Sequence, residues 1–480
     1  MTEHFPLLVA GATTTGGKLE VRSPWDESLI ATVDTADAAA IEQALATAQS
    51  LFRDRNRWLT PARRIEVLDR VAQIMAGRAE ELAQAAAREG GKPLIDSRIE
   101  VSRAIDGVRL CIQTLRTEGG QVVPTRVNAA SLNRIAFTQR EPVGVAVAVS
   151  AFNHPLNLTV HQVAPAVAAG CPVIIKPAED TPLSCCRFLQ MLEEAGLHAG
   201  WAQALTVKDL ALAERLVTDP RVAFFSFIGS ARVGWMLRAR LAAGTRCALE
   251  HGGVAPVIVA ADADLDVALP PLAKGGFYHA GQVCVSVQRI YAHESIAGRL
   301  ADGLAAIADR LKTGDPLDPA TEVGPFIRRA ERERVALWVE EAIAGGARLL
   351  AGGRRLGESC YAPTVLYDPP AAARVSTQEV FGPVVCVYPY RDLDEAIARA
   401  NSLPFAFQAA VFTRDLDTAL AVYNRLDASA VMVNDHTAFR VDWMPFAGLR
   451  QSGLGVSGIQ YTIRDMQVEK LLVMRSPTII

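Results

Sequence analysis

The sequence predicts an α/β protein with a doubly wound parallel-sheet domain, a second α/β domain and a small β arm. Its 480 residues exceed the length at which one hydrophobic core stops growing, so more than one domain is expected. Apolar strand-like runs alternate with helical segments after residue 143 and again after residue 250, the order of a doubly wound fold. Two isolated strand-like segments, within residues 121–141 and 466–480, predict the arm.

The first 120 residues predict short strands and then helices. Residues 1–35 contain two turn signals, Ser23-Pro24-Trp25 and Gly16-Gly17, and the glycine pair predicts a hairpin. Thr60-Pro61 has the order of a helix N-cap followed by proline at the first helical position. The helices are expected over residues 37–57, 60–76, 79–89 and 95–115.

Residues 134–140 alternate polar and apolar side chains, which predicts a strand with one exposed face. Residues 468–474 are similarly extended. The two segments lie far apart in the sequence, so each is expected to pair with the other or with another subunit.

Residues 144–149 form a continuous apolar run, as a buried parallel strand requires. The first alternation predicts strands over residues 172–175 and 222–227 and helices over 162–169, 181–196 and 231–243. The second alternation predicts strands over 257–259, 287–291, 409–412 and 430–433 and helices over 265–280, 295–311, 329–344 and 416–426. Ligands in such folds bind at the carboxyl ends of the strands.

Composition and charge argue against several classes of partner. Lys and Arg total 49 against 52 Asp and Glu, so the basic excess typical of nucleic-acid or anionic-membrane binding is missing. No apolar run has the length of a membrane span, and the N-terminus lacks the pattern of a secretory signal. The eight cysteines are scattered without metal-ligand spacing, which predicts reduced thiols, a cytoplasmic location and no metal site.

Polar residues follow the first two buried strands. Asn153 follows the first, where its amide either donates to a developing oxyanion or forms a turn before Pro155. Lys176 and Glu179 follow the second, either as contacts to the ribose hydroxyls of a nucleotide or as a surface ion pair.

Three later positions have the chemistry of an active site. Gly229-Ser230 opens a helix whose first N–H groups suit a diphosphate, although the turn lacks the full G-x-G-x-x-G fingerprint. Glu250, shortly before Gly252-Gly253, is a general base or part of a helix C-cap. Cys284, between two valines after a glycine-containing turn, is a nucleophile or a core thiol.

Together with Gln378–Pro383 and Met444–Gly453, these segments resemble the aldehyde dehydrogenase superfamily over nearly the whole chain. The resemblance implies oxidation of an aldehyde to its carboxylic acid, with NAD as the expected cofactor and NADP as the alternative. It also implies a cytoplasmic homodimer or homotetramer. The implied domains are an NAD(P)-binding domain (1–119 and 142–250), a catalytic domain (251–452) and an oligomerisation arm (120–141 and 466–480).

The resemblance implies a role for each candidate residue. Cys284 is the expected nucleophile, which forms a thiohemiacetal and then a thioester; Asn153 and the Cys284 N–H are the expected oxyanion hole, and Glu250 the base for hydrolysis. The expected cofactor contacts are Lys176 and Glu179 (adenosine ribose), Gly229 and Ser230 (diphosphate), and Glu379 and Phe381 (nicotinamide ribose). Glu179 favours NAD, because a carboxylate repels a 2′-phosphate.

The segment Asn434–Pro445 is similar to the branch that oxidises phosphonoacetaldehyde, which predicts phosphonoacetate as the product. Arg103, His154 and Arg440 match three positions of that branch's anion pocket, but Val283 replaces an arginine. The pocket is therefore expected to bind a phosphonate less tightly or to take another small anionic or hydroxylated aldehyde. The two arginines are alternatively solvated surface charges.

Other activities fit the same motifs: a lactaldehyde, semialdehyde or phosphorylated-aldehyde dehydrogenase, a phosphorylating or CoA-acylating relative, and a structural protein without catalysis. Glu250 argues against acyl transfer to CoA, because such relatives have less need of a base that activates water. The presence of every reactive group argues against a purely structural role.

Overall fold

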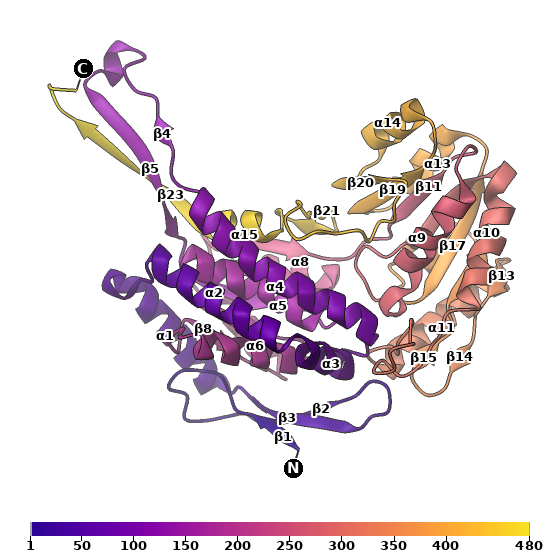
Figure 1. The fold of residues 1–480 in the computed structure, drawn as a ribbon, viewed down its shortest axis with the longest axis horizontal. Helices are drawn as coiled ribbons and strands as arrows, with labels where there is room; N and C mark the ends of the chain where they lie inside the picture. Colours follow the sequence, from indigo (N-terminus) through magenta and orange to yellow (C-terminus); the bar gives the residue numbers. More distant parts are fainter. Residues whose placement is uncertain (1, 480) are drawn as a thin grey trace.

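The computed structural model describes residues 2–479, which form two lobes and a projecting arm (Figure 1). The chain begins with a small sheet of β1 (Glu3–Phe5), β2 (Gly17–Arg22) and β3 (Leu29–Thr35). The turn between β2 and β3 begins at Ser23, so the predicted hairpin at Gly16-Gly17 is wrong: Gly17 is the first residue of β2 and pairs with Thr35.

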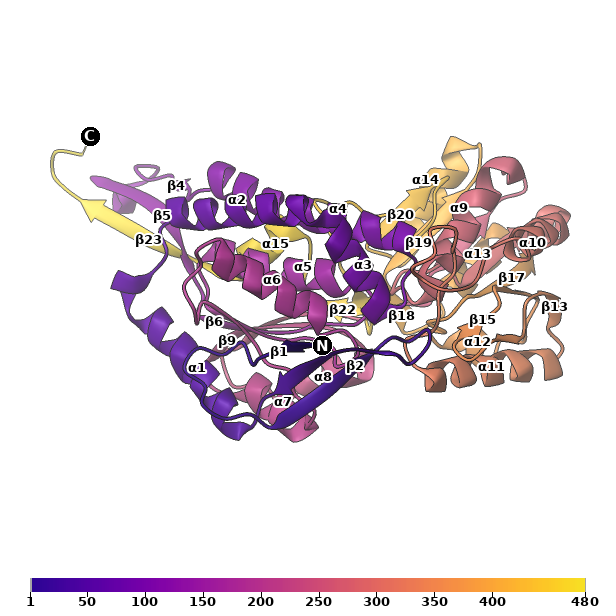
Figure 2. The same cartoon turned by 60° about the horizontal axis from the view of Figure 1, so that its bottom comes forward.

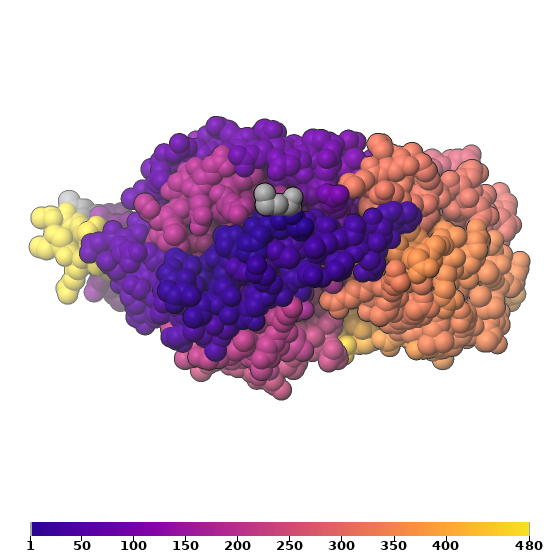
Figure 3. All heavy atoms as spheres, turned by 90° about the horizontal axis from the view of Figure 1, so that it is seen from below, coloured from indigo at the N-terminus to yellow at the C-terminus, as the bar shows by residue number. Residues whose placement is uncertain are grey.

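The N-terminal sheet also touches the second lobe. In Figure 3 the indigo N-terminal segment extends across the lower face toward the orange lobe. At that contact the Ser359 hydroxyl donates to the Trp25 carbonyl over 3.1 Å.

The first lobe contains a six-stranded sheet in the order β22-β10-β9-β6-β7-β8. Every neighbouring pair is parallel except β22 with β10. The chain runs from β6 outward to β8 and returns to β9 on the other side of β6, which makes a topological switch point there. The strands are β6 (Val145–Val149), β7 (Val173–Lys176), β8 (Ala202–Ala204), β9 (Val222–Ile228), β10 (Arg246–Glu250) and β22 (Gly453–Leu454).

Alternation along β6 builds a core on both faces of this sheet. Val145 and Val147 pack with α1, α7 and α8, whereas Ala146 and Ala148 face the opposite layer. The helices of the first face are α1 (Ala38–Arg53), α7 (Leu210–Thr218) and α8 (Ala231–Arg238). Those of the second are α2 (Pro61–Gly77), α3 (Ala79–Gly90), α4 (Leu94–Thr117), α5 (Pro155–Ala169), α6 (Leu183–Glu194) and α15 (Ile459–Asp465).

Several helix boundaries differ from the prediction, and those of α5, α6 and α8 lie in the first lobe. Helix α5 begins earlier, at Pro155, which occupies the first helical position, and α8 ends earlier, at Arg238. Thr181 does not cap α6, because Pro182 is the N-cap residue and the Thr181 hydroxyl instead donates to the Phe152 carbonyl over 3.4 Å.

The second lobe contains a seven-stranded sheet in the order β13-β16-β17-β12-β11-β19-β20, parallel except at β13. Its strands are β11 (Pro256–Val259), β12 (Arg289–His293), β13 (Arg348–Ala351), β16 (Thr364–Tyr367), β17 (Val384–Tyr390), β19 (Gln408–Phe412) and β20 (Ala430–Val433). Four short strands form two minor sheets: β14 (Arg355–Leu356) with β15 (Cys360–Tyr361), and β18 (Phe405–Ala406) with β21 (Leu449–Arg450).

Helices cover both faces of this sheet as well. Val257 and Val259 pack under α9 (Leu265–Phe277) and α10 (Glu294–Ala308). Ile258, between them, faces the other layer, formed by α11 (Arg329–Ala344), α12 (Arg374–Thr377), α13 (Leu393–Ala400) and α14 (Leu416–Arg425). Strands β13, β16 and β17 of this sheet are not among the strands that the sequence predicts.

The arm is a sheet of β4 (Val122–Val123), β5 (Arg134–Pro142) and β23 (Gln467–Arg475). Strands β5 and β23 pair antiparallel from Gln467–Pro142 to Arg475–Arg134, so the two isolated segments do pair with each other. In both views the arm projects away from the body on the side opposite the second lobe (Figures 1 and 2).

The domain division that the sequence predicts stays a prediction. No helix among residues 2–479 combines the length and apolar character needed to cross a membrane.

Candidate active site

The first lobe presents its candidate residues along one edge of its sheet. Asn153 and His154 follow β6, Lys176 ends β7, Gly229 and Ser230 follow β9, and Glu250 ends β10. Because these strands are parallel and adjacent, their carboxyl ends meet at the switch point.

The second lobe faces this edge with loops that precede two neighbouring strands. Cys284 lies before β12, and Glu379 and Phe381 lie before β17. The Gly253 N–H donates to the Cys284 carbonyl over 3.1 Å, which joins the cysteine loop to the segment after Glu250. One cavity of about 520 Å³ results, and its walls include every candidate residue: Arg103, Asn153, His154, Lys176, Glu179, Gly229, Ser230, Glu250, Cys284, Glu379, Phe381 and Arg440.

The Asn153 side chain connects the two lobes. Its amide nitrogen donates to the Gln282 carbonyl over 2.9 Å. Gln282 is buried and held by its own side chain, which donates to the Pro325 carbonyl (3.2 Å) and accepts from the Ile327 N–H (3.0 Å). A primary amide has two N–H donors, so Asn153 keeps one for a ligand while the other fixes its orientation.

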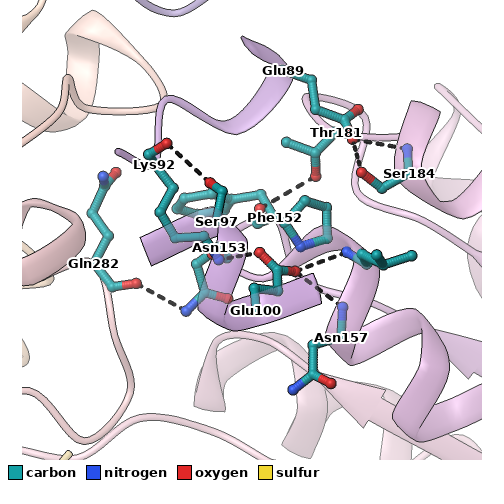
Figure 4. A network of polar contacts seen from close by, with 12 residues as sticks. Glu89, Lys92, Ser97, Glu100, Phe152, Asn153, Asn157, Thr181, Ser184 and Gln282 are labelled. Atoms are coloured by element: carbon teal, nitrogen blue, oxygen red, sulfur yellow. Dashed lines mark hydrogen bonds and ion pairs between the residues drawn. The ribbon is translucent and has the colours of Figure 1, made fainter. Parts of the chain in front are cut away.

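A buried ion pair, Lys92 with Glu100, lies beside the Asn153 loop (Figure 4). The Glu100 carboxylate accepts from the backbone N–H groups of Leu156 and Asn157, each over 3.0 Å, at the start of α5. Lys92 pairs with Glu100 and lies 3.5 Å from the Asn153 carbonyl oxygen. A carboxylate at a helix N-terminus is stabilised by the helix dipole, so this pair positions the whole turn. The sequence motifs do not identify it.

Burial governs ionisation around the cysteine. Burial raises the pKa of the Cys284 thiol to about 12, and the nearby carboxylates of Glu250 and Glu379 contribute, while Arg440 opposes the rise. Burial also raises the pKa of Glu379 to about 8. The free protein therefore holds both groups protonated at neutral pH.

The cavity walls fit a dinucleotide cofactor. Lys176 and Glu179 form an ion pair of 3.6 Å. The surface-pair alternative also requires this contact, but Lys176 is buried and so does not lie on the surface. Ser230 is the N-cap of α8 and makes no capping bond with its side chain, which leaves the hydroxyl and helix start for a diphosphate. Glu379 Oε1 is buried without a hydrogen-bond partner, as suits an acceptor for a ribose hydroxyl.

Glycine is required beside Glu379. A Cβ at Gly252 would lie 1.6 Å from Glu379 Oε1, so only glycine lets the carboxyl group rest against the backbone there. Gly252 therefore has a packing reason. Glu250 ends a strand, which makes the helix C-cap alternative wrong.

The candidate substrate residues form a charged cluster with two residues that the sequence motifs do not identify, Asp442 and His161. Arg103 donates to both carboxylate oxygens of Asp442, over 3.0 and 2.7 Å, and His161 Nε2 lies 2.8 Å from Asp442 Oδ1. Burial alone would raise the pKa of Asp442, but His161 and Arg103 hold it well below its usual range.

The Arg440 side chain is only 11% exposed, so the surface alternative is wrong for it. Its guanidinium lies 3.6 Å from the centre of the Phe446 ring, and its Nε has no hydrogen-bond partner. His154 packs edge-on against His279 (6.0 Å between ring centres), and burial holds the pKa of His154 well below its usual value, so the ring is neutral. No group of three or more His, Cys, Asp or Glu side chains within residues 2–479 could hold a metal ion.

A doubly wound sheet whose strand ends share one cavity with a half-buried thiol defines a dinucleotide-dependent enzyme of the thiol-nucleophile class. The model of the Aldehyde dehydrogenase family matches residues 12–472. The chain belongs to this family and is an NAD(P)-dependent oxidoreductase that acts on small aldehydes.

Individual relatives extend over nearly the full chain. The 3-sulfolactaldehyde dehydrogenase of Priestia megaterium is 38% identical over 462 residues, 96% of each protein. Aldehyde dehydrogenase 21 of Physcomitrella patens, solved with the reaction product succinate, is 34% identical with a TM-score of 0.95 over 100% of both chains. A glyceraldehyde-3-phosphate dehydrogenase of Methanocaldococcus jannaschii, solved with NADP, is 33% identical with a TM-score of 0.91 over 97% of this chain and 100% of its own.

Replacing Lys92 is expected to destabilise the protein. Lys92→Met leaves the buried Glu100 carboxylate without its counterion, so the free energy of unfolding in urea should fall by about 3–5 kcal/mol. The double variant Lys92→Met/Glu100→Gln should recover most of this loss. Lys312→Met, which removes an exposed ion pair with Asp318, should cost less than about 1 kcal/mol. Equal stability of the single and double variants would contradict this account.

The Cys284 thiol should react slowly at neutral pH in the cofactor-free protein. Only the thiolate is alkylated, and a pKa of about 12 means that raising the pH from 7 to 9 increases the thiolate fraction about tenfold per unit. The measurement is iodoacetamide labelling, followed by mass spectrometry of the Cys284 peptide, in a Cys247→Ser background. The urea-unfolded chain, in which the thiol titrates near about 8.5, should level off above that pH. A plateau below pH 8 in the folded protein would contradict the raised pKa.

Proposed function

We propose that this protein oxidises a small anionic aldehyde to its carboxylic acid, with Cys284 as nucleophile, Asn153 as oxyanion donor and Glu250 as base. The observation that carries the proposal is the shared cavity, which joins the Cys284 thiol to the buried cation of Arg440. A buried arginine without a hydrogen-bonded carboxylate favours an anionic ligand.

The chemistry assigned to these residues follows from their positions. The Cys284 thiol loses its proton to solvent water as its sulfur attacks the aldehyde carbon, and the resulting oxyanion accepts from the second N–H of Asn153 and from the Cys284 backbone N–H. A nicotinamide cofactor, which Lys176, Ser230 and Glu379 would hold, would supply the hydride acceptor needed to oxidise the thiohemiacetal to a thioester. Glu250 then takes a proton from water as the water oxygen attacks the thioester carbon, and the acid leaves as the Cys284 sulfur departs.

Three of the similar proteins support an anionic substrate class, whereas others are named for lactaldehyde and betaine aldehyde. The sulfolactaldehyde enzyme is named for a sulfonate, the plant enzyme was solved with a dicarboxylate product, and the archaeal enzyme is named for a phosphate ester. Phosphonoacetaldehyde, the substrate that the sequence predicts, belongs to the same class. The neutral aldehyde lactaldehyde is the alternative that tests whether the anionic group matters.

A substrate panel with NAD and with NADP tests the proposal. At least one of sulfolactaldehyde, succinate semialdehyde, glyceraldehyde 3-phosphate and phosphonoacetaldehyde should exceed lactaldehyde in kcat/KM by about tenfold, because a buried charge-assisted bond discriminates strongly. Glu179 should make NAD the better cofactor. Turnover is measured as absorbance of the reduced cofactor, and a preference for lactaldehyde would refute the anionic class.

Two variants separate the chemical roles in the same assay. Cys284→Ala should abolish turnover. Glu250→Gln should lower the steady-state rate by about 10²–10⁴-fold while leaving a first-turnover burst of reduced cofactor, because hydrolysis and not oxidation needs the base. Loss of the burst in Glu250→Gln would show that Glu250 acts before hydrolysis.

We also propose that the arm joins copies of this chain into a homodimer or homotetramer. Strand β23 is the edge strand of the arm and carries the exposed side chains of Leu471, Leu472 and Val473. An exposed apolar edge favours pairing with another strand. Leu472→Asp should therefore lower the mass in analytical ultracentrifugation, whereas Leu416→Asp on exposed α14 should not; a monomeric wild-type protein would contradict the proposal.

A further inference from the structure

Four side chains form a charged cluster at one end of the cavity, which three of them, Arg103, His161 and Arg440, line. The fourth, Asp442, from the loop after β20, is 2% exposed and is surrounded by the other three. Arg103 uses both its Nε and one terminal nitrogen on the two oxygens of Asp442. This bidentate pair balances the charge of Arg103 and occupies two of its five N–H donors.

His161 lies between Asp442 and Arg440. Its Nε2 lies 2.8 Å from Asp442 Oδ1, and its Nδ1 lies 3.5 Å from a terminal nitrogen of Arg440. The ring therefore contacts both the carboxylate and the second guanidinium of the cluster.

Arg440 is then the one cation of this cluster without a hydrogen-bonded carboxylate. Its Nε is 3.8 Å from Asp442 Oδ1, beyond hydrogen-bond distance, and its flat face rests on Phe446. A planar guanidinium fixed in this way presents an edge to two oxygens of a ligand. Glu250 lines the same cavity.

We infer that Asp442 limits the substrate to a tail with a single negative charge, a sulfonate or carboxylate in preference to a dianionic phosphonate or phosphate. The inference rests on the proposed function, because it assumes that the anionic group binds at Arg440. The single cation of Arg440 balances one negative charge of the ligand. The second negative charge of a dianion would be buried without a partner, and the nearby Asp442 carboxylate would repel it. Asp442 is thus a specificity-determining residue that acts through Arg103.

The test compares two aldehydes of the same length, sulfoacetaldehyde and phosphonoacetaldehyde, at pH 8. The wild-type protein should favour sulfoacetaldehyde in kcat/KM by about tenfold or more, since an unpaired buried charge is costly. Asp442→Asn removes one negative charge and releases Arg103, so this ratio should fall by about tenfold, mainly through the KM of the phosphonate. Asp435→Asn, which removes a more exposed carboxylate of the same loop, should leave the ratio unchanged.

The pH dependence gives a second measurement that needs no variant. A phosphonate takes up a proton near about pH 6–7, as phosphate groups do, whereas a sulfonate stays singly charged. Lowering the pH from 8 to 6 should therefore reduce the factor by which the wild-type protein favours sulfoacetaldehyde over phosphonoacetaldehyde in kcat/KM. This result depends on the substrate's own titration and survives even if Asp442→Asn fails to fold.

The outcomes distinguish this inference from the proposed function. If lactaldehyde exceeds both anionic aldehydes, the proposed function fails. The role of Asp442 is overturned, while the proposed function stands, if both anionic aldehydes exceed lactaldehyde in kcat/KM but the wild type prefers the phosphonate. It is also overturned if Asp442→Asn folds and keeps the wild-type ratio of the two kcat/KM values. If the ratio narrows both in Asp442→Asn and at pH 6, the single-charge limit is supported.

Discussion

The hydrogen bond from the Asn153 amide to the Gln282 carbonyl is the constraint on which the candidate site depends. It ties the loop after β6 in the first lobe to the loop that carries Cys284 in the second. Each end is held independently, by the Lys92–Glu100 pair on one side and by the side chain of Gln282 on the other. The thiol and the free amide N–H therefore keep one relative position, which is what stabilisation of an oxyanion requires.

The burial that creates the cavity also sets its chemical state. Removing water strengthens every charge interaction in the site but disfavours each ion that lacks a partner. Cys284 and Glu379 are consequently protonated in the free protein, whereas Asp442 stays ionised because two partners surround it. A site of this kind does little chemistry until bound molecules supply the missing charges and hydrogen bonds, which limits side reactions of the thiol.

The sequence predicts the two sheets and the strand-end residues because both signals are local. A buried parallel strand reads as a short apolar run, and a polar residue after it falls at the binding edge, as for Asn153 and Lys176. The supporting residues have no such signal. Asp442 lies 339 positions from its partner Arg103, and His161 lies within the apolar helix α5, where it reads as a core position. Contacts of this range depend on how the lobes pack, which no window of sequence contains.

Val283 shows how the same packing bears on substrate choice. Where the similar branch has an arginine before the nucleophile, this chain buries Val283 in an apolar cluster with Val285, Phe407 and Phe446. Phe446 is the ring on which Arg440 rests, so the cluster that excludes one cation positions the other. An arginine at position 283 would bring a second buried charge and disturb that support. With Arg103 already paired with Asp442, the loss of this arginine leaves Arg440 as the cation that can balance a ligand's negative charge. The two features lie on different loops, and they favour the same kind of substrate.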